Sequence, residues 1–487
     1  YAGKAHFILT SATISNPESF ALKLIEEPVE LIDEDGSPRG ARHFIIYNPP
    51  FIEARLGIRR SAYADTLQIA AALMDYNLQS IIFARSRQAV EKLVYDLRGV
   101  LNLPPEQIRG YRSGYLAQER REIEQGLKSG SIQLVVATNA LELGVDIGEM
   151  KAAILVGYPG SIAALRQQAG RAGRKANASL AVLVATAGAI DQYLARHPEY
   201  LNKPPEHALL DPDNLIILLH HLRCAAFELP FSSQASFGSL SANMLTELLD
   251  ILASSGVLSK GEQKYFWTSS QYPADTVSLR SASPEIITLH TVQDDRMIPI
   301  GEIDPHSAYW MTHPQAIYLH DGSMYRVDEL DLKEKMALLT PVQVDYFTEA
   351  RSSTHIEKIS VLETQETSGT AINYGELLVS SQVTGYKKVN IYTREVMGEY
   401  NLDMPLVQFR TTGCWISLKE TLIDNLRLAG KWNSDRNDYG PRWDKITLSI
   451  RRRDLFRCQS CGLPENGKAF HVHHKTPLRC FHNIEEA

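Results

Sequence analysis

The stretch Gln167-Gln-Ala-Gly-Arg-Ala-Gly-Arg174 decides how the rest of the chain is interpreted. Its two arginines, Arg171 and Arg174, are three residues apart, so a helix would place both on one face. Guanidinium groups stay charged and bind phosphate oxygens through paired hydrogen bonds. In phosphoryl transfer, arginines of this kind stabilise the charge on the transferring γ-phosphoryl group. A solvated basic turn is the alternative, but the preceding sequence favours a nucleotide site.

The segment Ala137-Thr-Asn-Ala-Leu-Glu-Leu-Gly-Val-Asp-Ile-Gly148 comes one predicted strand before that stretch. Its glycines allow the backbone to approach a ligand closely, because they carry no side chain. Asp146 can accept a hydrogen bond from a ribose hydroxyl or act through metal-bound water. The two segments together predict a site that faces a nucleotide.

The first 205 residues alternate short apolar strands with amphipathic helices, which is the pattern of a parallel α/β sheet. Helices are predicted over residues 88–97, 117–128 and 162–170. Strands are predicted at five apolar runs: Phe7–Thr10, Ser80–Ala84, Ile132–Ala137, Ala152–Val156 and Ser179–Val184.

The pattern changes after residue 205. Two apolar helices, Asn214–Phe227 and Ala242–Ser254, precede a predicted hairpin at Gly261–Thr268, the outline of a winged helix. Short alternating strands from Tyr272 to Leu418 predict a small antiparallel β-barrel. We divide the chain into the segments 1–40, 41–205, 206–270, 271–418, 419–445 (a helix and linker) and 446–487.

Composition places the 487 residues among ordinary globular proteins of about three domains, with 44% hydrophobic and 22% charged residues. No apolar run approaches the roughly 20 residues of a membrane-spanning helix. Five cysteines are too few for a disulfide scaffold and indicate a reducing cytoplasm. The net charge of −7 conceals basic balances in residues 51–175 and 441–487, which agree with phosphate contacts.

Four segments stand in the order of motifs III, IV, V and VI of superfamily 2 helicases: Ser11-Ala-Thr13, Ile81–Arg87, Thr138–Gly148 and Gln167–Arg174. The chain resembles the DNA helicases of the MrfA type, the mitomycin-repair helicases of bacteria and their fungal relatives. Asp211–Pro230, Tyr272–Asp275 and Leu279–Ser283 narrow the resemblance to this branch. It implies that residues 41–205 form a RecA-like lobe and that residues 1–40 are the tail of another.

The resemblance also implies a role for each matching residue, with a purely structural role as the alternative outside motif VI. Arg171, Arg174 and Gln167 would act at the γ-phosphate, and Gly144 and Asp146 would face the nucleotide. Ser11 and Thr13 would couple the nucleotide state to the grip on DNA. Contacts to the DNA backbone, which carry little sequence information, would come from Arg85, Ser86, Ser113, Gly114 and Thr138.

The sequence contains neither a GxxxxGK[ST] loop nor a DExH box. These motifs cradle the phosphates and hold Mg²⁺, so ATP with Mg²⁺ would require a lobe that precedes Tyr1. We therefore expect a fragment cut at both ends. It would be part of an ATP-dependent 3′→5′ DNA helicase in repair or defence, and inactive as a motor by itself.

The C-terminal residues suggest a second chemistry. Cys458 and Cys461 form a CxxC pair, and His473 and His474 follow on a predicted strand. This arrangement resembles the ββα-metal fold of HNH nucleases. The resemblance implies that His473 holds Mg²⁺ or Mn²⁺, that His474 activates water, and that the cysteines are half of a Zn²⁺ site. A structural zinc ribbon without nuclease activity is the alternative.

Three functions remain open from the sequence. The leading hypothesis is the helicase. The others are an HNH-type endonuclease that uses the helicase-derived lobe to bind DNA, and a noncatalytic DNA-binding remnant. All three predict DNA that is single-stranded or has a single-stranded tail as the partner, no membrane, and a bacterial cytoplasmic location near the nucleoid.

Overall fold

The structure is a computed structural model. It describes residues 6–11, 13–34, 36, 40–55, 57–143, 145–148, 150–173, 178–212, 214–232, 235–277, 286–367, 369–391, 393, 395–429, 431–432 and 443–457. The chain forms two compact units, one consisting largely of residues 60–348 and the other largely of residues 349–387 and 398–457. Each unit is described by itself.

A six-stranded parallel sheet confirms the α/β lobe predicted for residues 41–205. Its strand order is β1-β8-β7-β4-β6-β5, and every neighbouring pair is parallel. Residues 7–10, predicted as another strand, have no β partner in the described part of the chain. The six strands are β1 (Arg42–Tyr47), β4 (Ser80–Phe83), β5 (Ile108–Tyr111), β6 (Leu134–Ala137), β7 (Ala152–Val156) and β8 (Ser179–Val184).

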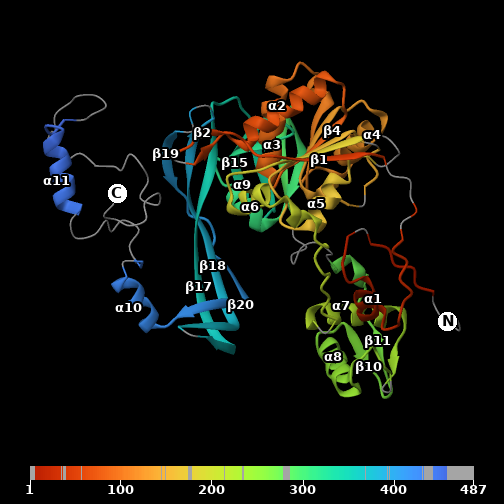
Figure 1. Cartoon of the computed structure of the whole chain (residues 1–487). Coiled ribbons are helices and arrows are strands. Elements are labelled where there is room, and N and C mark those ends of the chain that lie inside the picture. Colours follow the sequence, from red (N-terminus) through yellow and green to blue (C-terminus); the bar gives the residue numbers. More distant parts are fainter. Residues whose placement is uncertain are drawn as a thin grey trace. The chain divides into compact units, whose positions relative to one another are not determined.

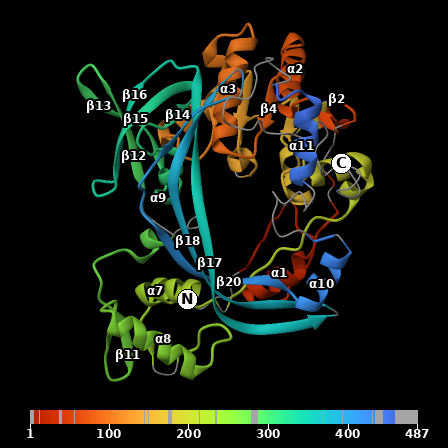
Figure 2. The same cartoon turned by 90° about the vertical axis from the view of Figure 1, so that its left-hand side faces the viewer.

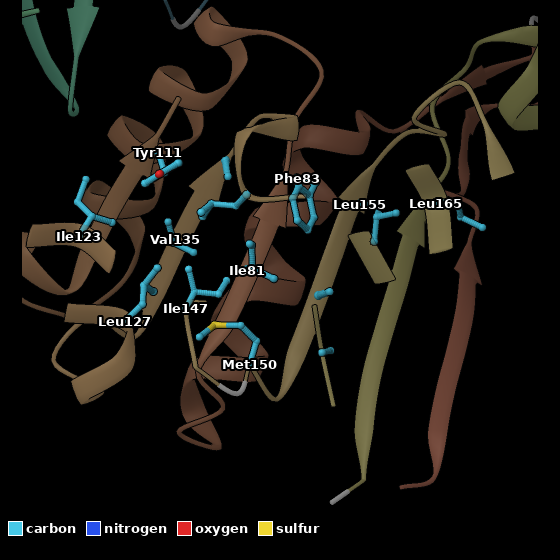
Figure 3. Packing of buried hydrophobic residues seen from close by; sticks show 14 of the residues in the cluster. Ile81, Phe83, Tyr111, Ile123, Leu127, Val135, Ile147, Met150, Leu155 and Leu165 are labelled. Carbon is cyan, nitrogen blue, oxygen red and sulfur yellow. The ribbon is translucent and has the colours of Figure 1, made fainter. Parts of the chain in front are cut away.

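Helices cover both faces of this sheet (Figure 1). Side chains alternate between the faces of a strand, so Ile81 and Ile82 on β4 enter two different apolar clusters. One cluster packs against α2 (Ala62–Asp75) and α3 (Arg87–Val100). The other, shown in Figure 3, packs against α4 (Ala117–Ser129), α5 (Ile162–Ala169) and α6 (Ala189–Arg196). Strands β4, β6 and β7 are buried along their whole length, which explains why they read as continuous apolar runs.

Polar side chains fix where several helices begin. The hydroxyl of Ser86 accepts from the Ala89 N–H at 3.1 Å at the start of α3, and Ser161 caps α5 in the same way at 3.0 Å. Asn214 and Ser241 cap α7 (Leu215–Glu228) and α8 (Ala242–Ser254). Such caps satisfy backbone N–H groups that lack a partner within the helix.

The winged-helix prediction is confirmed. Helices α7 and α8 pack on a small antiparallel sheet of order β10-β11-β9, around a core that includes Leu222, Leu249 and Tyr265. Its strands are β9 (Phe231–Ser232), β10 (Leu258–Lys260) and β11 (Lys264–Trp267).

The single antiparallel barrel predicted for residues 271–418 is wrong. The described residues form two open sheets instead, and β12 (Ile287–Gln293) pairs with β16 (Met336–Pro341) in parallel. Helix α9 (Pro305–Met311) follows the β12–β13 hairpin and lies beside this sheet (Figure 2). Alternation of side chains shows where strands run but not which strands pair. The remaining strands of the sheet, in the order β13-β12-β16-β15-β14, are β13 (Arg296–Ile303), β14 (Ile317–His320) and β15 (Ser323–Asp331).

The second open sheet contains two strands much longer than predicted, β17 (Tyr346–Thr367) and β18 (Thr370–Asn390), which run side by side in Figures 1 and 2. It is completed by β19 (Val396–Asn401) and β20 (Val407–Leu418), which both pair with β18. The predicted helix after it is present as α10 (Glu420–Leu428). The other elements are α1 (Pro17–Ile25), β2 (Phe51–Glu53), β3 (Ile58–Arg59) and α11 (Trp443–Arg453).

Two other sequence predictions concern membrane-spanning helices and the C-terminal cysteines and histidines. Among the described residues, no helix combines the length and apolarity needed to cross a bilayer. The described part of the chain ends at residue 457, so Cys458, Cys461, His473 and His474 lie outside it.

Candidate functional site

The predicted DNA-contacting residues follow three neighbouring strands of the parallel sheet. Arg85 comes after β4, Ser113 after β5 and Thr138 after β6. Carboxyl ends of parallel strands meet at one edge of a sheet, which is where open α/β sheets bind ligands. The fold therefore gathers residues that are 25 to 53 positions apart in the sequence.

Arg85 is held at this edge by contacts that the sequence did not predict. Its guanidinium donates to the carbonyl oxygen of Tyr158, with Nε at 3.1 Å, and lies 3.7 Å from a carboxylate oxygen of Asp191. Asp191 is buried and also accepts from the N–H of Tyr158 and from the N–H and hydroxyl of Thr186. The Arg85 side chain is 53% exposed, so part of the guanidinium can reach a phosphate.

The remaining backbone-contact candidates have local structural roles as well. The hydroxyl of Ser86 caps α3. Ser113 is exposed. Gly114 adopts φ +100°, and a Cβ there would lie 2.6 Å from the carbonyl oxygen of Glu302. Thr138 caps a short 3-10 helix by accepting from the Ala140 N–H at 3.4 Å. The turn at Gly114 requires glycine for both conformation and space.

Motif VI and motif V are joined by partly buried hydrogen bonds. The Arg171 guanidinium, 5% exposed, donates to the carbonyl oxygen of Glu142 at 2.6 and 3.0 Å and to that of Val145 at 2.7 Å. Gln168 donates to the Glu142 carboxylate at 3.0 Å. In this structure Arg171 thus organises the motif V turn, a role that the sequence did not indicate. Two other residues predicted for the nucleotide site, Arg174 and Gly144, lie outside the described residues.

Asp146 is the described member of the predicted nucleotide-facing pair. Its side chain is 69% exposed, accepts from the Gly148 N–H at 3.3 Å and lies 3.2 Å from the ammonium of Lys128. Its exposure leaves this carboxylate accessible to a polar ligand.

Motif III meets motif VI. The side-chain amide of Gln167 donates to the hydroxyl of Thr13, although 154 positions separate the two residues. Nearby, the Asn16 side chain pairs with both backbone groups of Ala208, at 2.8 and 3.1 Å. Ser11 is exposed. The structure therefore brings together Thr13 and Gln167, the two residues for which a coupling role and a γ-phosphate role are predicted.

Glu206 is a contributor that the sequence did not reveal. Its carboxylate accepts from the N–H groups of Ile162 and Ala163, at 2.7 and 3.0 Å, at the start of the motif VI helix α5. Desolvation acts to raise the pKa of this exposed carboxylate, but the two hydrogen bonds, together with its own backbone N–H and the charge of Arg166, outweigh that effect, and the pKa of Glu206 lies below its ordinary value. No local pattern connects residues 44 positions apart, so only the fold could identify this cap.

The metal site predicted at the C-terminal cysteines and histidines is not tested by the described residues. In the residues that the structure describes, no group of three or more histidine, cysteine, aspartate or glutamate side chains is placed to hold a metal ion. The four residues predicted to bind zinc or a catalytic metal lie outside that part of the chain.

Comparisons with known proteins match two parts of the chain to described domains. Residues 64–176 match the helicase conserved C-terminal domain. Residues 210–282 match the winged helix domain of the ATP-dependent helicase HRQ1. The first range contains strands β4 to β7 of the parallel sheet with motifs IV to VI, and the second contains the two helices and the hairpin of the winged helix.

Longer matches extend over most of the chain. The uncharacterized ATP-dependent helicase YprA of Bacillus subtilis is 42% identical over 423 residues, 86% of this chain and 56% of its own length. ATP-dependent helicase hrq1 of Schizosaccharomyces pombe is 30% identical over 435 residues, 87% of this chain and 40% of its own. The chain thus spans about half the length of these relatives.

Two crystal structures are also similar. The DUF1998 helicase MrfA bound to DNA superimposes with a TM-score of 0.74 at 39% identity, covering 93% of this chain and 59% of that one. MrfA bound to DNA and AMPPNP gives a TM-score of 0.71 at 40% identity, covering 82% and 54%.

The cap at α5 predicts a dependence of stability on pH. Because folding lowers the pKa of Glu206, its contribution is present above the unfolded pKa of about 4.3 and is lost as the pH falls through the lower folded value. Glu206→Gln should therefore reduce the unfolding free energy at neutral pH, by less than about 1 kcal/mol for this exposed carboxylate. Urea denaturation at neutral and acidic pH measures both effects.

Glu247, an exposed glutamate on α8, offers the matched control. Glu247→Gln should follow the unmodified chain at both pH values. If Glu206→Gln also loses as much stability on acidification as the unmodified chain, the assignment of the cap is contradicted.

Proposed function

We propose that this chain provides the second motor lobe of an ATP-dependent 3′→5′ DNA helicase in DNA repair or defence. The proposal is supported by the similarity of the chain to the MrfA-type DUF1998 helicases of superfamily 2 and by its match to the helicase C-terminal domain. The observation that carries this proposal is the contact between Gln167 and Thr13. It links the residue predicted to sense the γ-phosphate to the one predicted to couple that state to the DNA.

Arg171 and Arg174 would stabilise charge on the γ-phosphoryl group of ATP. To do so, Arg171 would exchange a carbonyl acceptor at Glu142 or Val145 for a phosphate oxygen. The motif V turn would then be released or re-formed with each nucleotide. Thr138, at the end of β6, lies just before that turn, so a change at the phosphate would reach the DNA grip directly.

Mg²⁺ neutralises phosphate charge in such enzymes. The residues that would hold it, a P-loop hydroxyl and an acidic box, do not occur in this sequence. We therefore assign no Mg²⁺ ligand to this chain. For the same reason we propose that ATP hydrolysis requires a nucleotide-binding lobe in addition to these residues.

DNA would lie along the carboxyl edge of the sheet. Arg85 offers a cation there, while the turns at Ser113–Gly114 and Thr138 offer hydroxyl and backbone N–H groups. Such groups grip a strand through its phosphates with little regard to sequence. The MrfA structure with bound DNA is consistent with this choice of partner.

The nuclease hypothesis stays a prediction from the sequence. It rests on Cys458, Cys461, His473 and His474, with Zn²⁺ in a structural role and Mg²⁺ or Mn²⁺ in a catalytic one. No observation in the described residues favours it over the helicase.

The first test concerns ATP. The chain alone should hydrolyse no ATP, whereas a protein that also contains a lobe with the GxxxxGK[ST] and DExH motifs should do so when single-stranded DNA is added. In that protein Arg171→Ala or Arg174→Ala should lower turnover by ~10³-fold, the scale of a lost arginine finger. Steady-state phosphate release measures this.

Arg196, exposed in the last turn of α6, is the control, and Arg196→Ala should retain normal turnover. Melting curves should accompany the assay, because Arg171 also holds the motif V turn. Normal turnover in both motif VI variants would refute their assignment.

The second test concerns DNA. Binding of a single-stranded oligonucleotide should weaken steeply with salt and depend little on its sequence. Arg85→Ala should lower the slope of log affinity against log salt by about 0.7, the value for one lost phosphate contact on a single strand. Arg196→Ala should leave the slope unchanged. Fluorescence anisotropy between low and moderate salt measures it, and a flat salt response in the unmodified chain would contradict the proposed mode.

A further inference from the structure

A fully buried ion pair lies next to the predicted DNA-binding turn. Glu91 on α3 and Arg112 after β5 are each 1% exposed, and their carboxylate oxygen and guanidinium Nε are 2.6 Å apart. Removing two charges from water is unfavourable unless both find further hydrogen-bond partners. The identity of those partners therefore shows what the pair requires of its surroundings.

Several of the partners come from another sheet. The Arg112 guanidinium donates to the hydroxyl of Tyr318 at 2.9 Å and to the carbonyl oxygen of Leu319 at 3.2 Å. The second Glu91 carboxylate oxygen accepts from the N–H of Gly322 at 3.1 Å. All three partners belong to the β14–β15 hairpin, more than 200 positions away. The hydrogen bonding of this buried ion pair is complete only when the hairpin is docked.

Asp321 of the same hairpin makes further polar contacts with the lobe close to this ion pair. Asp321, at the tip of the hairpin, lies 3.0 Å from Nη2 of Arg98 and 3.1 Å from Nε of Arg109, and it accepts from the Gly110 N–H at 3.3 Å. Two of these contacts are to β5 itself, the strand that leads into the turn at Ser113.

The turn is held directly as well. Arg112 donates to the carbonyl oxygen of Ser113 at 3.1 Å, and the Glu302 N–H on β13 donates to the carbonyl oxygen of Gly114 at 2.8 Å. A buried ion pair that only stabilised the lobe would have no need of contacts to this turn. Here the pair, the hairpin and β13 converge on two residues, Ser113 and Gly114.

We propose that Glu91, Arg112 and Asp321 are positioning residues for DNA binding: they lock the β12–β16 sheet to the motor lobe and thereby hold the Ser113–Gly114 turn in its strand-gripping geometry. The inference rests on the proposed function for the identity of the ligand. On this inference the five-stranded sheet of β12 to β16 is a fixed part of the motor lobe. The sheet and the lobe would then move together during each ATP cycle.

The test uses Asp321→Asn in the complete chain. This side chain is 22% exposed, so its replacement avoids stranding a buried charge. Asp328→Asn is the matched control, because Asp328 lies on β15 of the same sheet and is 28% exposed, and its carboxylate contacts the sheet neighbours Arg326 and Thr340. Circular dichroism melting checks that both variants fold.

Asp321→Asn should bind a single-stranded oligonucleotide about 5- to 10-fold more weakly, the scale of one lost neutral hydrogen bond. Its salt slope should be unchanged, because the turn offers neutral groups, whereas Arg85→Ala alters the slope. Asp328→Asn should bind normally. If Asp321→Asn is unstable, Tyr318→Phe removes one Arg112 partner and should show the same pattern. Affinity equal to that of the Asp328→Asn control would overturn the proposal.

Amide hydrogen exchange separates this inference from the proposed function. Residues 113–116 should exchange faster in Asp321→Asn than in Asp328→Asn, whether or not DNA binds. If the unmodified chain fails to bind DNA, the proposed function falls, and faster exchange at the turn would still establish the lock. Equal exchange in the two variants would overturn the lock itself.

Discussion

Burial of Glu91 and Arg112 constrains the architecture around them more than any apolar contact does. An ion pair sealed from water needs its remaining donors and acceptors satisfied. Here the β14–β15 hairpin supplies three of the partners, and the Tyr115 hydroxyl and the Ser113 carbonyl supply others. The lobe and the β12–β16 sheet are consequently joined by polar contacts of fixed geometry. Apolar surfaces would allow the two to slide, whereas directional hydrogen bonds set one arrangement.

That arrangement matters because of where it acts. The parallel sheet collects Arg85, Ser113 and Thr138 at its carboxyl edge, and the buried network fixes the turn that contains Ser113. At the motif V turn, which follows Thr138, Arg171 donates to the carbonyl groups of Glu142 and Val145. A nucleotide that attracts Arg171 would therefore alter one DNA-contacting turn while another stays fixed, which is a means of moving along a strand.

Much of the lobe could be predicted from the sequence, because local signals suffice for it. Apolar runs predicted β4, β6, β7 and β8 of the sheet but neither β1 nor β5. The spacing of Arg171 and Arg174, with the motif order, is the source of the predicted nucleotide and DNA residues. The winged helix followed from two apolar helices and a hairpin. Strand pairing was missed in residues 271–418, because alternation is the same in a closed barrel and in open sheets that contain a parallel pair. Glu206 and Asp321 were missed because their partners are 44 and more than 200 positions away.

The central claim is that this chain grips single-stranded DNA along the carboxyl edge of its parallel sheet. Hydrogen exchange of the chain with and without a single-stranded oligonucleotide tests it most directly. We expect protection at residues 85–88, 113–116 and 138–142, which follow β4, β5 and β6. Protection confined to the winged helix, residues 215–267, with none at the sheet edge, would contradict it.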